Sequence, residues 1–401
     1  MKRYIKIICC IVIVAALAIL VKSRWNAWFK NVPEEPYAAA TVPDRITLTP
    51  GEDFMSERTV SWRCGDTLAQ SFLTLTAGGD TATFKATGSV IESRGGRDAF
   101  YYVTIDSLQP GSEYSYRVTT AGKQSREYRF AMPDADEPAR RFLFFGDVQD
   151  NIGGQSGEWF AKLYRQYPDV DFWACAGDLI ERPIETYWNY LYQSADSILA
   201  TMPLLNSTGN HDYLKGLYLT IDSRWKHTFV YPENGAATAI GISYYIDMPG
   251  MRFIVLDTNG IQDCVTITAR YQWLKRVLAS TGDKWKVVMW HHPAYSVRSS
   301  RINLPVRNTF VPLLERYGVH LVLQGHEHGF MRHIGTHGDH PVYLISYMSP
   351  KSYKLRKSSP GFKVIADTPM YHIVDYNNST MEVRSYALAN DSIMDFVKIS
   401  R

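Results

Sequence analysis

The sequence predicts an all-β sandwich followed by a larger α/β domain in which layered sheets are flanked by helices. Three observations support this fold class. Short alternating strands fill residues 44–133, apolar strands alternate with helical segments from residue 140 onward, and the tail after residue 341 returns to strands. Strands interleaved with helices indicate an α/β layered domain that binds ligands at the carboxyl ends of its strands.

Length and composition exclude several classes of protein. The chain has 401 residues, enough for two domains and a large core. Its 43 Lys and Arg against 40 Asp and Glu give a net charge of +3, and no basic run is long enough to predict nucleic acid as the main partner. The five cysteines contain no Cys-x-x-Cys pair, so a thiolate zinc site is not expected.

Residues 1–30 have the pattern of an export signal. Basic residues precede an apolar run from Ile7 to Val21, and Lys22 and Arg24 follow it. A charged start with a short apolar core is typical of a secretory signal, but the residues after the core make a poor cleavage site. We therefore expect an uncleaved signal-anchor, with a cleaved signal peptide as the alternative. Either one exports the body of the protein, as a membrane-anchored protein of the cell envelope or as a secreted one.

The segment after this signal has two parts. Residues 31–43 contain three prolines and are expected to form a linker. Residues 44–133 read as about seven short strands separated by glycine turns, which predicts a β-sandwich. Its turn Leu108-Gln109-Pro110-Gly111-Ser112-Glu113-Tyr114 resembles that of a fibronectin type III module. We expect a structural spacer, and the alternative is that one edge shapes the substrate site.

Residues 140–401 are expected to form the catalytic domain. Apolar residues at helical spacing predict helices over residues 159–167, 185–199, 269–278 and 310–317. The tail predicts strands over residues 342–346, 371–375, 381–386 and 393–399. Either one mixed sheet or two sheets stacked between helices would result.

Five short polar blocks, each after an apolar run, carry the chemistry. They are Gly146-Asp147, Gly177-Asp178, Gly209-Asn210-His211-Asp212, His291-His292 and Gly325-His326-Glu327-His328. Strands that end in metal ligands can build a two-metal hydrolytic site along a sheet edge, and this mixture of donors suits iron, zinc or manganese. Glycine is expected to let the backbone turn sharply before each ligand. In an extended segment, His326 and His328 would point to the same side.

In this order the blocks resemble those of the calcineurin-like metallophosphoesterases, and among them the purple acid phosphatases, which also carry an N-terminal fibronectin-like sandwich. The resemblance covers the chain from residue 44 onward. It implies that Asp147 and His328 hold a first metal ion, that Asp178 bridges, and that a second ion binds Asn210, His291 and His326. His291 is preferred over His292 because it completes the family's Val-x-x-His pattern and stands two residues before Pro293.

The resemblance also implies an acid phosphatase-like reaction on a small phosphorylated substrate. A metal-held hydroxide would attack phosphorus in line, and His211 would protonate the departing oxygen. Asp212 is expected to orient His211, while His292 and Tyr295 are candidates for the phosphate pocket. The alternatives are a phosphodiesterase or nucleotide pyrophosphatase of the same superfamily, and a binding protein with a degraded site.

Two residues depart from the purple subgroup. Glu181 stands where that subgroup has a metal-binding tyrosine, so no tyrosinate-to-iron colour is expected. Glu181 would either bind metal or form a salt bridge with Arg182 or Arg140. Gln149 stands where the superfamily has histidine and the subgroup glycine, and it would be a weak ligand or would contact substrate or water.

Two further groups of residues are lesser candidates. Arg298 and Arg301 are candidates for substrate charge neutralisation, with ordinary solvent exposure as the alternative. His333, His337 and His340 are expected to form a histidine-rich surface turn.

Overall fold

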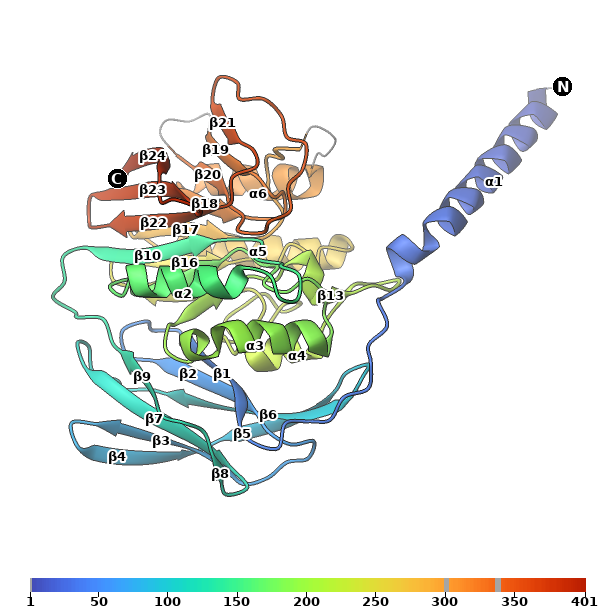
Figure 1. The fold of residues 1–401 in the computed structure, drawn as a ribbon. Helices are drawn as coiled ribbons and strands as arrows, with labels where there is room; N and C mark the ends of the chain where they lie inside the picture. The colour runs from blue at the N-terminus through green and yellow to red at the C-terminus, as the bar shows by residue number, and fades with distance from the viewer. Residues whose placement is uncertain (1, 299–302, 336–339) are drawn as a thin grey trace.

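The computed structural model describes residues 2–298, 303–335 and 340–401. In chain order these form a long helix, a β-sandwich and an α/β domain with helices on its sheets, which confirms the predicted fold class (Figure 1). Arg301 and His337 lie outside the described residues.

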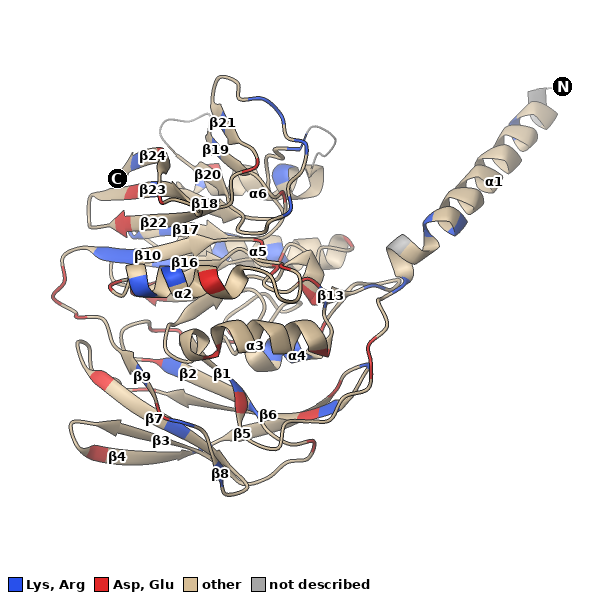
Figure 2. Ribbon diagram, viewed as in Figure 1, with Lys and Arg blue, Asp and Glu red and all other residues tan. Residues whose placement is uncertain are grey.

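Helix α1 (Lys2–Phe29) projects away from the body of the molecule (Figure 1). Its segment Tyr4–Asn26 is long and apolar enough to cross a membrane by length and composition, with a mean hydropathy of 2.9 and no burial inside the protein. Charged residues are absent from its central run and gather near its ends, as Figure 2 shows at the end facing the body. A signal sequence has the same properties, so both sequence-based alternatives stand.

The sandwich has nine strands in two sheets, two more than expected. One sheet has the order β1 (Asp44–Pro50), β2 (Arg58–Arg63), β6 (Arg97–Ile105), β5 (Thr87–Glu92). The other has β4 (Asp80–Lys85), β3 (Ser71–Ala77), β7 (Glu113–Thr120) and β8 (Lys123–Gln124), with β9 (Tyr128–Ala131) also paired to β7. Buried and exposed residues alternate along β7, because one face packs on the sandwich core. Trp62, fully buried and stacked on Tyr101, lies in that core.

The α/β domain has two stacked sheets rather than one. The first runs β12 (Leu204–Asn206), β11 (Phe172–Cys175), β10 (Arg140–Phe145), β22 (Met370–Tyr376), β23 (Thr380–Ala387), β24 (Ile393–Ser400). The second runs β15 (Tyr244–Met248), β16 (Met251–Val255), β17 (Trp285–Met289), β18 (Leu321–Gln324), β20 (Val342–Ile345), β19 (Phe330–Ile334), β21 (Phe362–Ile365). Strands β10–β12 are mutually parallel, and so are β16, β17, β18 and β20.

Aromatic side chains join the two sheets, and helices cover their outer faces. The Phe253 ring lies 5.8 Å from Phe142 and 5.7 Å from Phe172 across the interface. The helices are α2 (Ser156–Gln166) and α3 (Glu185–Leu199) on the first sheet, and α5 (Cys264–Ser280) and α6 (Leu304–Arg316) on the second (Figure 1). Helix α5 begins before the expected residue 269 because Asp263 accepts a hydrogen bond from the Thr266 amide and caps it.

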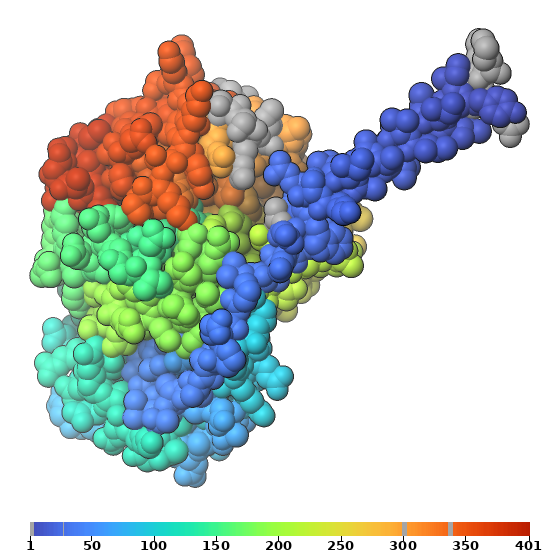
Figure 3. All heavy atoms as spheres, turned by 45° about the vertical axis from the view of Figure 1, so that its right-hand side comes forward, coloured from blue at the N-terminus to red at the C-terminus, as the bar shows by residue number. Residues whose placement is uncertain are grey.

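The sandwich packs against α3 and the short helix α4 (Ser223–Thr228) (Figure 1). Arg45 and Arg63 of the sandwich both bind the Glu185 carboxylate at the start of α3, at 2.5 and 2.7 Å. Residues 31–43, the expected linker, lie against the body along this junction (Figure 3).

Candidate metal centre

The five polar blocks meet at one edge of the stacked sheets. Asp147, Asp178 and Asn210 follow β10, β11 and β12 of the first sheet. His291 follows β17 of the second sheet, and His326 and His328 follow β18. Because the strands within each set are parallel neighbours, their carboxyl ends lie side by side. The first sheet supplies the oxygen donors and the second supplies the imidazoles.

Four of these side chains converge on one point. His291 Nε2 lies 3.2 Å from Asp178 Oδ2, 3.2 Å from Asn210 Oδ1 and 3.2 Å from His326 Nδ1. The ligand atoms of Asp178, His291 and His326 all lie within 4.8 Å of one another. Ligand atoms gathered this closely can hold a metal ion, and nitrogen with oxygen donors suits iron, zinc or manganese.

Backbone carbonyls determine which imidazole nitrogen is available for a metal. His291 Nδ1 donates to the Ala176 carbonyl at 2.7 Å, and His328 Nδ1 donates to the Lys351 carbonyl at 3.2 Å. Each bond places the proton on Nδ1 and leaves the Nε2 lone pair for a ligand. His326 instead presents Nδ1 toward His291.

Asp147 has an unsatisfied oxygen at the centre. Its side chain is completely buried, and Oδ2 accepts a hydrogen bond from the His326 amide at 2.5 Å. Among the described residues no hydrogen-bond donor reaches Oδ1, which lies 3.6 Å from His328 Nε2. Burial therefore raises the pKa of Asp147 well above its usual value. A metal ion between Asp147 and His328 would satisfy this oxygen, so these residues fit the first metal site.

The electrostatics of the other site also favour a positive charge. Burial lowers the pKa of His291, but the facing Asp178 carboxylate outweighs it and raises the pKa to about 9. Burial opposes ionisation of Asp178, yet its interactions with the neighbouring His291 and His211 side chains hold its pKa below the usual range. A bound metal ion would supply the positive charge that the Asp178 carboxylate otherwise stabilises on His291.

Four of the six expected ligands have left-handed backbone conformations. Their φ values are 45° at Asp147, 55° at Asp178, 75° at His326 and 29° at His328. Such conformations cost about 1–3 kcal/mol each in non-glycine residues and gather at functional sites. The segment from His326 to His328 is therefore bent, which corrects the expectation of an extended strand.

The glycines before the ligands serve two purposes. Gly177 alone among them has a left-handed φ, 89°. Gly209 and Gly325 are required by close approach, because a Cβ would lie 1.9 Å from Asp178 Oδ1 at the first and 2.4 Å from Asp147 Oδ2 at the second. The expected sharp turn therefore applies to Gly177, while the other two make room for carboxylates.

The residues that depart from the purple subgroup both touch this centre. Gln149 Nε2 donates to Asp178 Oδ2 at 2.6 Å, so its amide group holds the expected bridging carboxylate. The Glu181 carboxylate pairs closely with Lys351, and Arg182 lies farther away at 3.9 Å. Arg140, the other expected partner, lies 3.7 Å from Asp171 instead.

His211 is held beside the same carboxylate by main-chain groups. Its amide donates to Asp178 Oδ1 at 2.8 Å, and its ring Nδ1 donates to the Glu181 carbonyl at 2.5 Å. Nε2 is thus the ring nitrogen left for proton transfer. The buried Asp212 carboxylate accepts a hydrogen bond from the Gly209 amide at 2.7 Å, so it shapes the turn that carries His211.

The two pocket candidates after His291 lie in different surroundings. The His292 ring lies 4.5 Å from that of His326 and bonds to the Thr258 hydroxyl. Tyr295 packs in an aromatic cluster, with ring distances of 4.4 Å to His333 and 4.9 Å to Tyr343. His292 therefore borders the metal centre, while Tyr295 lies among aromatic rings with the Arg307 guanidinium 4.6 Å from its own ring.

The lesser candidates also divide into one residue near the metal centre and others packed elsewhere. The Arg298 guanidinium lies 4.1 Å from the Tyr353 ring, which is 4.7 Å from that of His328. His333 stacks on Phe362 at 3.9 Å, whereas His340 lies beside His320, with the rings 5.3 Å apart.

Sequence reasoning missed residues that support the centre. Lys351 pairs with Glu181 and orients His328, but it lies in irregular chain after β20 with no motif around it. Asp257 follows β16 of the second sheet. Its buried carboxylate binds Arg270 and the Thr208 hydroxyl, bracing the loop that carries Asn210.

Comparisons with known families match both folded parts of the chain. Residues 140–330 match the calcineurin-like phosphoesterase family, and residues 43–132 match the purple acid phosphatase N-terminal domain. The chain is 24% identical to purple acid phosphatase 15 of Arabidopsis thaliana, over 67% of this chain and 53% of that protein. It is 25% identical to an uncharacterised protein of Mycobacterium tuberculosis, over 70% of this chain and 60% of that protein. It thus spans little more than half the length of these relatives.

A solved structure has the same fold. A purple acid phosphatase from yellow lupin (Lupinus luteus) seeds superposes with a TM-score of 0.74 at 18% identity, covering 90% of this chain and 75% of that one. At this identity the likeness extends to the fold, and the chemistry depends on the residues described above.

Proposed function

We propose that this chain, a calcineurin-like phosphoesterase that carries the purple acid phosphatase N-terminal domain, hydrolyses phosphomonoesters with the help of two metal ions. The observation that carries the proposal is the convergence of carboxylate, amide and imidazole donors beside His211 at one sheet edge. The orphaned oxygen of Asp147 supports the second ion, because a buried carboxylate facing His328 needs a cation.

The ligands divide into two sets with one shared member. Asp147 and His328 would hold the first ion, and Asn210, His291 and His326 the second. Asp178 would bridge them, and Gln149 holds its carboxylate in place. When bound, iron, zinc or manganese ions supply Lewis-acid chemistry: they acidify the attacking water and neutralise charge on the phosphoryl oxygens.

His211 supplies the proton for the departing group. The Glu181 carbonyl holds its Nδ1, so a proton on Nε2 can pass to the leaving oxygen. A positioned acid of this kind contributes typically 10²–10⁴-fold to the rate. His292 would border the phosphate, next to His326.

Glu181 makes this centre colourless in our proposal. Its carboxylate is bound to Lys351, and Glu181 occupies the sequence position at which the purple subgroup has its metal-binding tyrosine. The iron-loaded protein should therefore lack the visible charge-transfer band of a tyrosinate.

The protein would act outside the cytoplasm on small phosphorylated substrates. Helix α1 supports an anchor, because it is apolar, unburied and long enough to cross a membrane. The near-neutral net charge of +3 gives no support for nucleic acid as a partner.

Hydrolysis of para-nitrophenyl phosphate and bis-para-nitrophenyl phosphate, with iron, zinc and manganese supplied in turn, tests the function. We expect turnover of the monoester and much slower turnover of the diester. Preference for the diester would assign a phosphodiesterase instead, and no turnover with any metal would leave a binding protein.

The His211→Ala variant tests the acid. It should keep its metal content and lose most turnover of an alkyl phosphate, whose leaving group needs the proton, while losing less with para-nitrophenyl phosphate. Loss of metal would show that His211 is a ligand.

A further inference from the structure

A small cavity opens beside His211. It has a volume of about 140 Å³, and Asn210 and His211 of the metal centre form part of its wall. This is well below the roughly 300–1,000 Å³ of pockets for drug-sized ligands, so it suits a small chemical group.

The wall of this cavity is strongly basic. Lys30, Arg94, Arg182 and Lys215 line it, and Glu181 is the one acidic residue among its lining residues. The Glu181 carboxylate is already paired with Lys351 and lies 3.9 Å from Arg182, and Arg94 lies 3.9 Å from the Glu34 carboxylate. Lys30 and Lys215 add positive charge beyond these pairs. The cavity therefore presents an excess of positive charge next to the candidate general acid, and Arg and Lys side chains bind phosphate and carboxylate groups.

Three separate parts of the chain build this wall. Arg94 comes from the β5–β6 loop of the sandwich and donates hydrogen bonds to the carbonyls of Val32 and Pro183. Asn31, just after α1, makes two hydrogen bonds to the main chain of Lys215, at 2.9 and 2.8 Å. The sandwich and the segment after α1 thus reach the catalytic edge.

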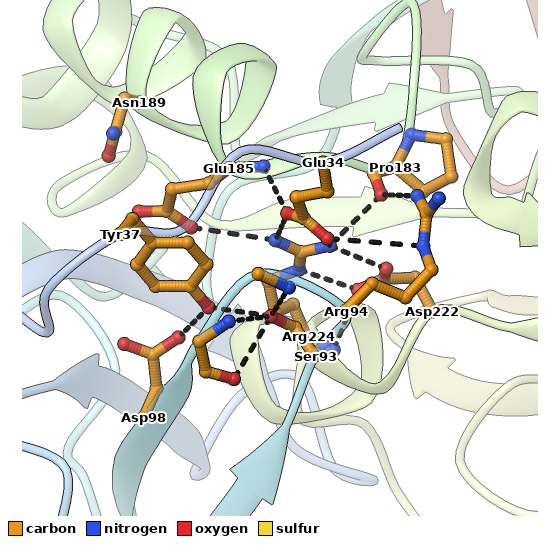
Figure 4. Close-up of polar contacts among 12 residues, drawn as sticks. Glu34, Tyr37, Ser93, Arg94, Asp98, Pro183, Glu185, Asn189, Asp222 and Arg224 are labelled. Carbon is orange, nitrogen blue, oxygen red and sulfur yellow. Dashed lines mark hydrogen bonds and ion pairs between the residues drawn. The ribbon is translucent and has the colours of Figure 1, made fainter. Parts of the chain in front are cut away.

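A buried ionic network holds this segment in place (Figure 4). The Glu34 side chain is 1% exposed, and its carboxylate accepts hydrogen bonds from Arg224 at 2.5 Å and from the Glu185 amide at 2.7 Å. Tyr37 donates to Asp98 at 2.6 Å, farther along the same segment. The wall around Lys30 and Asn31 is therefore a built part of the molecule.

We propose that this cavity binds the leaving group, and that the enzyme prefers phosphomonoesters whose departing group carries a second anionic group. His211 lines the cavity and is also the candidate acid, so the group that it protonates would depart into the basic wall. The inference rests on the proposed function, because a leaving group exists only where an ester is cleaved.

Two kinds of substrate would carry such a second anionic group. Lys30 directly follows Phe29, the last residue of α1, so the cavity lies within a few residues of the apolar helix. A soluble ester and a lipid head group at a membrane surface present the same anion to this wall.

Two matched aryl esters test the preference in the full-length protein. 4-(Carboxymethyl)phenyl phosphate and its methyl ester have similar leaving groups that differ by one negative charge. We expect kcat/KM to be roughly five-fold higher for the carboxylate, the size of one half-exposed charge pair, and the preference to shrink as salt is added. A ratio near one would overturn the subsite while leaving the proposed function intact, whereas failure to cleave either ester would overturn the function.

Charge removal tests whether the cavity is responsible. Arg182→Gln and Lys30→Gln, each on a solvent-accessible side chain, should lower the ratio, whereas Arg129→Gln on β9, outside the cavity, should leave it unchanged. Equal thermal unfolding midpoints would verify that the variants fold. A ratio unaffected in both cavity variants would refute the assignment.

Phosphate release from phosphatidylinositol 4-phosphate in phosphatidylcholine vesicles, compared with its deacylated soluble head group, distinguishes the two sources. Faster release from vesicles supports a lipid substrate, and equal or faster release from the soluble form supports a soluble one. Slower release from both than from soluble inositol monophosphate, which lacks the second anion, would contradict the preference.

Discussion

Buried His372 should make the protein unstable in acid. It lies on β22 between Phe144 and Phe330, at ring distances of 5.4 and 5.8 Å, and its Nδ1 bonds to the Ser385 hydroxyl at 2.8 Å. Among the described residues, Nε2 has no hydrogen-bond partner. Burial lowers its pKa to about 3, although Asp395 opposes the shift.

The magnitude follows from proton linkage. In the unfolded chain the pKa of histidine is about 6.5. Below that pH, His372 binds a proton in the unfolded state but not in the native state. The free energy of unfolding therefore falls by about 1.4 kcal/mol for each pH unit of acidification. The loss attributable to His372 is about 2 kcal/mol at pH 5 and about 3 kcal/mol at pH 4, and it levels off near the native pKa of about 3.

The His372→Phe variant removes this titration while filling the same aromatic site. Urea unfolding of both proteins is followed by tryptophan fluorescence at about pH 7, 5 and 4, with the same metal ions present at each pH. The measurement gives the free energy of unfolding of each protein. The wild-type value minus the variant value should fall by about 2 kcal/mol between pH 7 and 5. His227→Phe, at a half-buried histidine, controls for histidine replacement itself. A difference independent of pH would refute the reasoning.

Three more predictions concern the centre and its surroundings. Gly209→Ala would place a Cβ 1.9 Å from Asp178 Oδ1 and should abolish metal binding, measured as metal content, whereas Gly216→Ala in the following loop should keep it. Glu34→Ala leaves buried Arg224 without one partner and should lower stability by about 3 kcal/mol and expose residues 31–43 to protease, while exposed Glu35→Ala should do neither. The iron-loaded protein should show no visible charge-transfer band, and a band would mean that another phenol binds iron, with Tyr353 the first candidate because its ring lies 4.7 Å from His328.

The sequence predicted elements well where the signal was local. Helix α3 spans the expected residues 185–199, because its apolar positions keep helical spacing between clear ends. Helix α6 begins six residues before the expected 310, because Pro305 looks like a helix breaker in sequence but fits the first turn. The strands that precede the ligands were found because buried parallel strands are continuous apolar runs.

The features that escaped prediction depend on distant parts of the chain or on backbone angles. Glu181 pairs with Lys351, 170 residues away, where no local pattern marks a partner. The left-handed conformations of His326 and His328 leave no trace in residue type. The aromatic neighbours of Tyr295 come from β19, β20 and β21, and Arg307 of α6 lies 4.6 Å from its ring, contacts that no local pattern after His291 marks.

The division of donors between the two sheets has a consequence for assembly. The oxygen donors Asp147, Asp178 and Asn210 belong to one layer, and the imidazoles of His291, His326 and His328 to the other. Neither layer alone holds both kinds of ligand, so the proposed centre can form only after the sheets have packed together. Bound metal would then act as a cross-link between ligands that lie far apart in sequence. A cross-link that closes a long loop gives the largest entropic stabilisation. Metal binding would complete folding. Removing the metal with a chelator should therefore weaken the packing between the two sheets before either sheet unfolds.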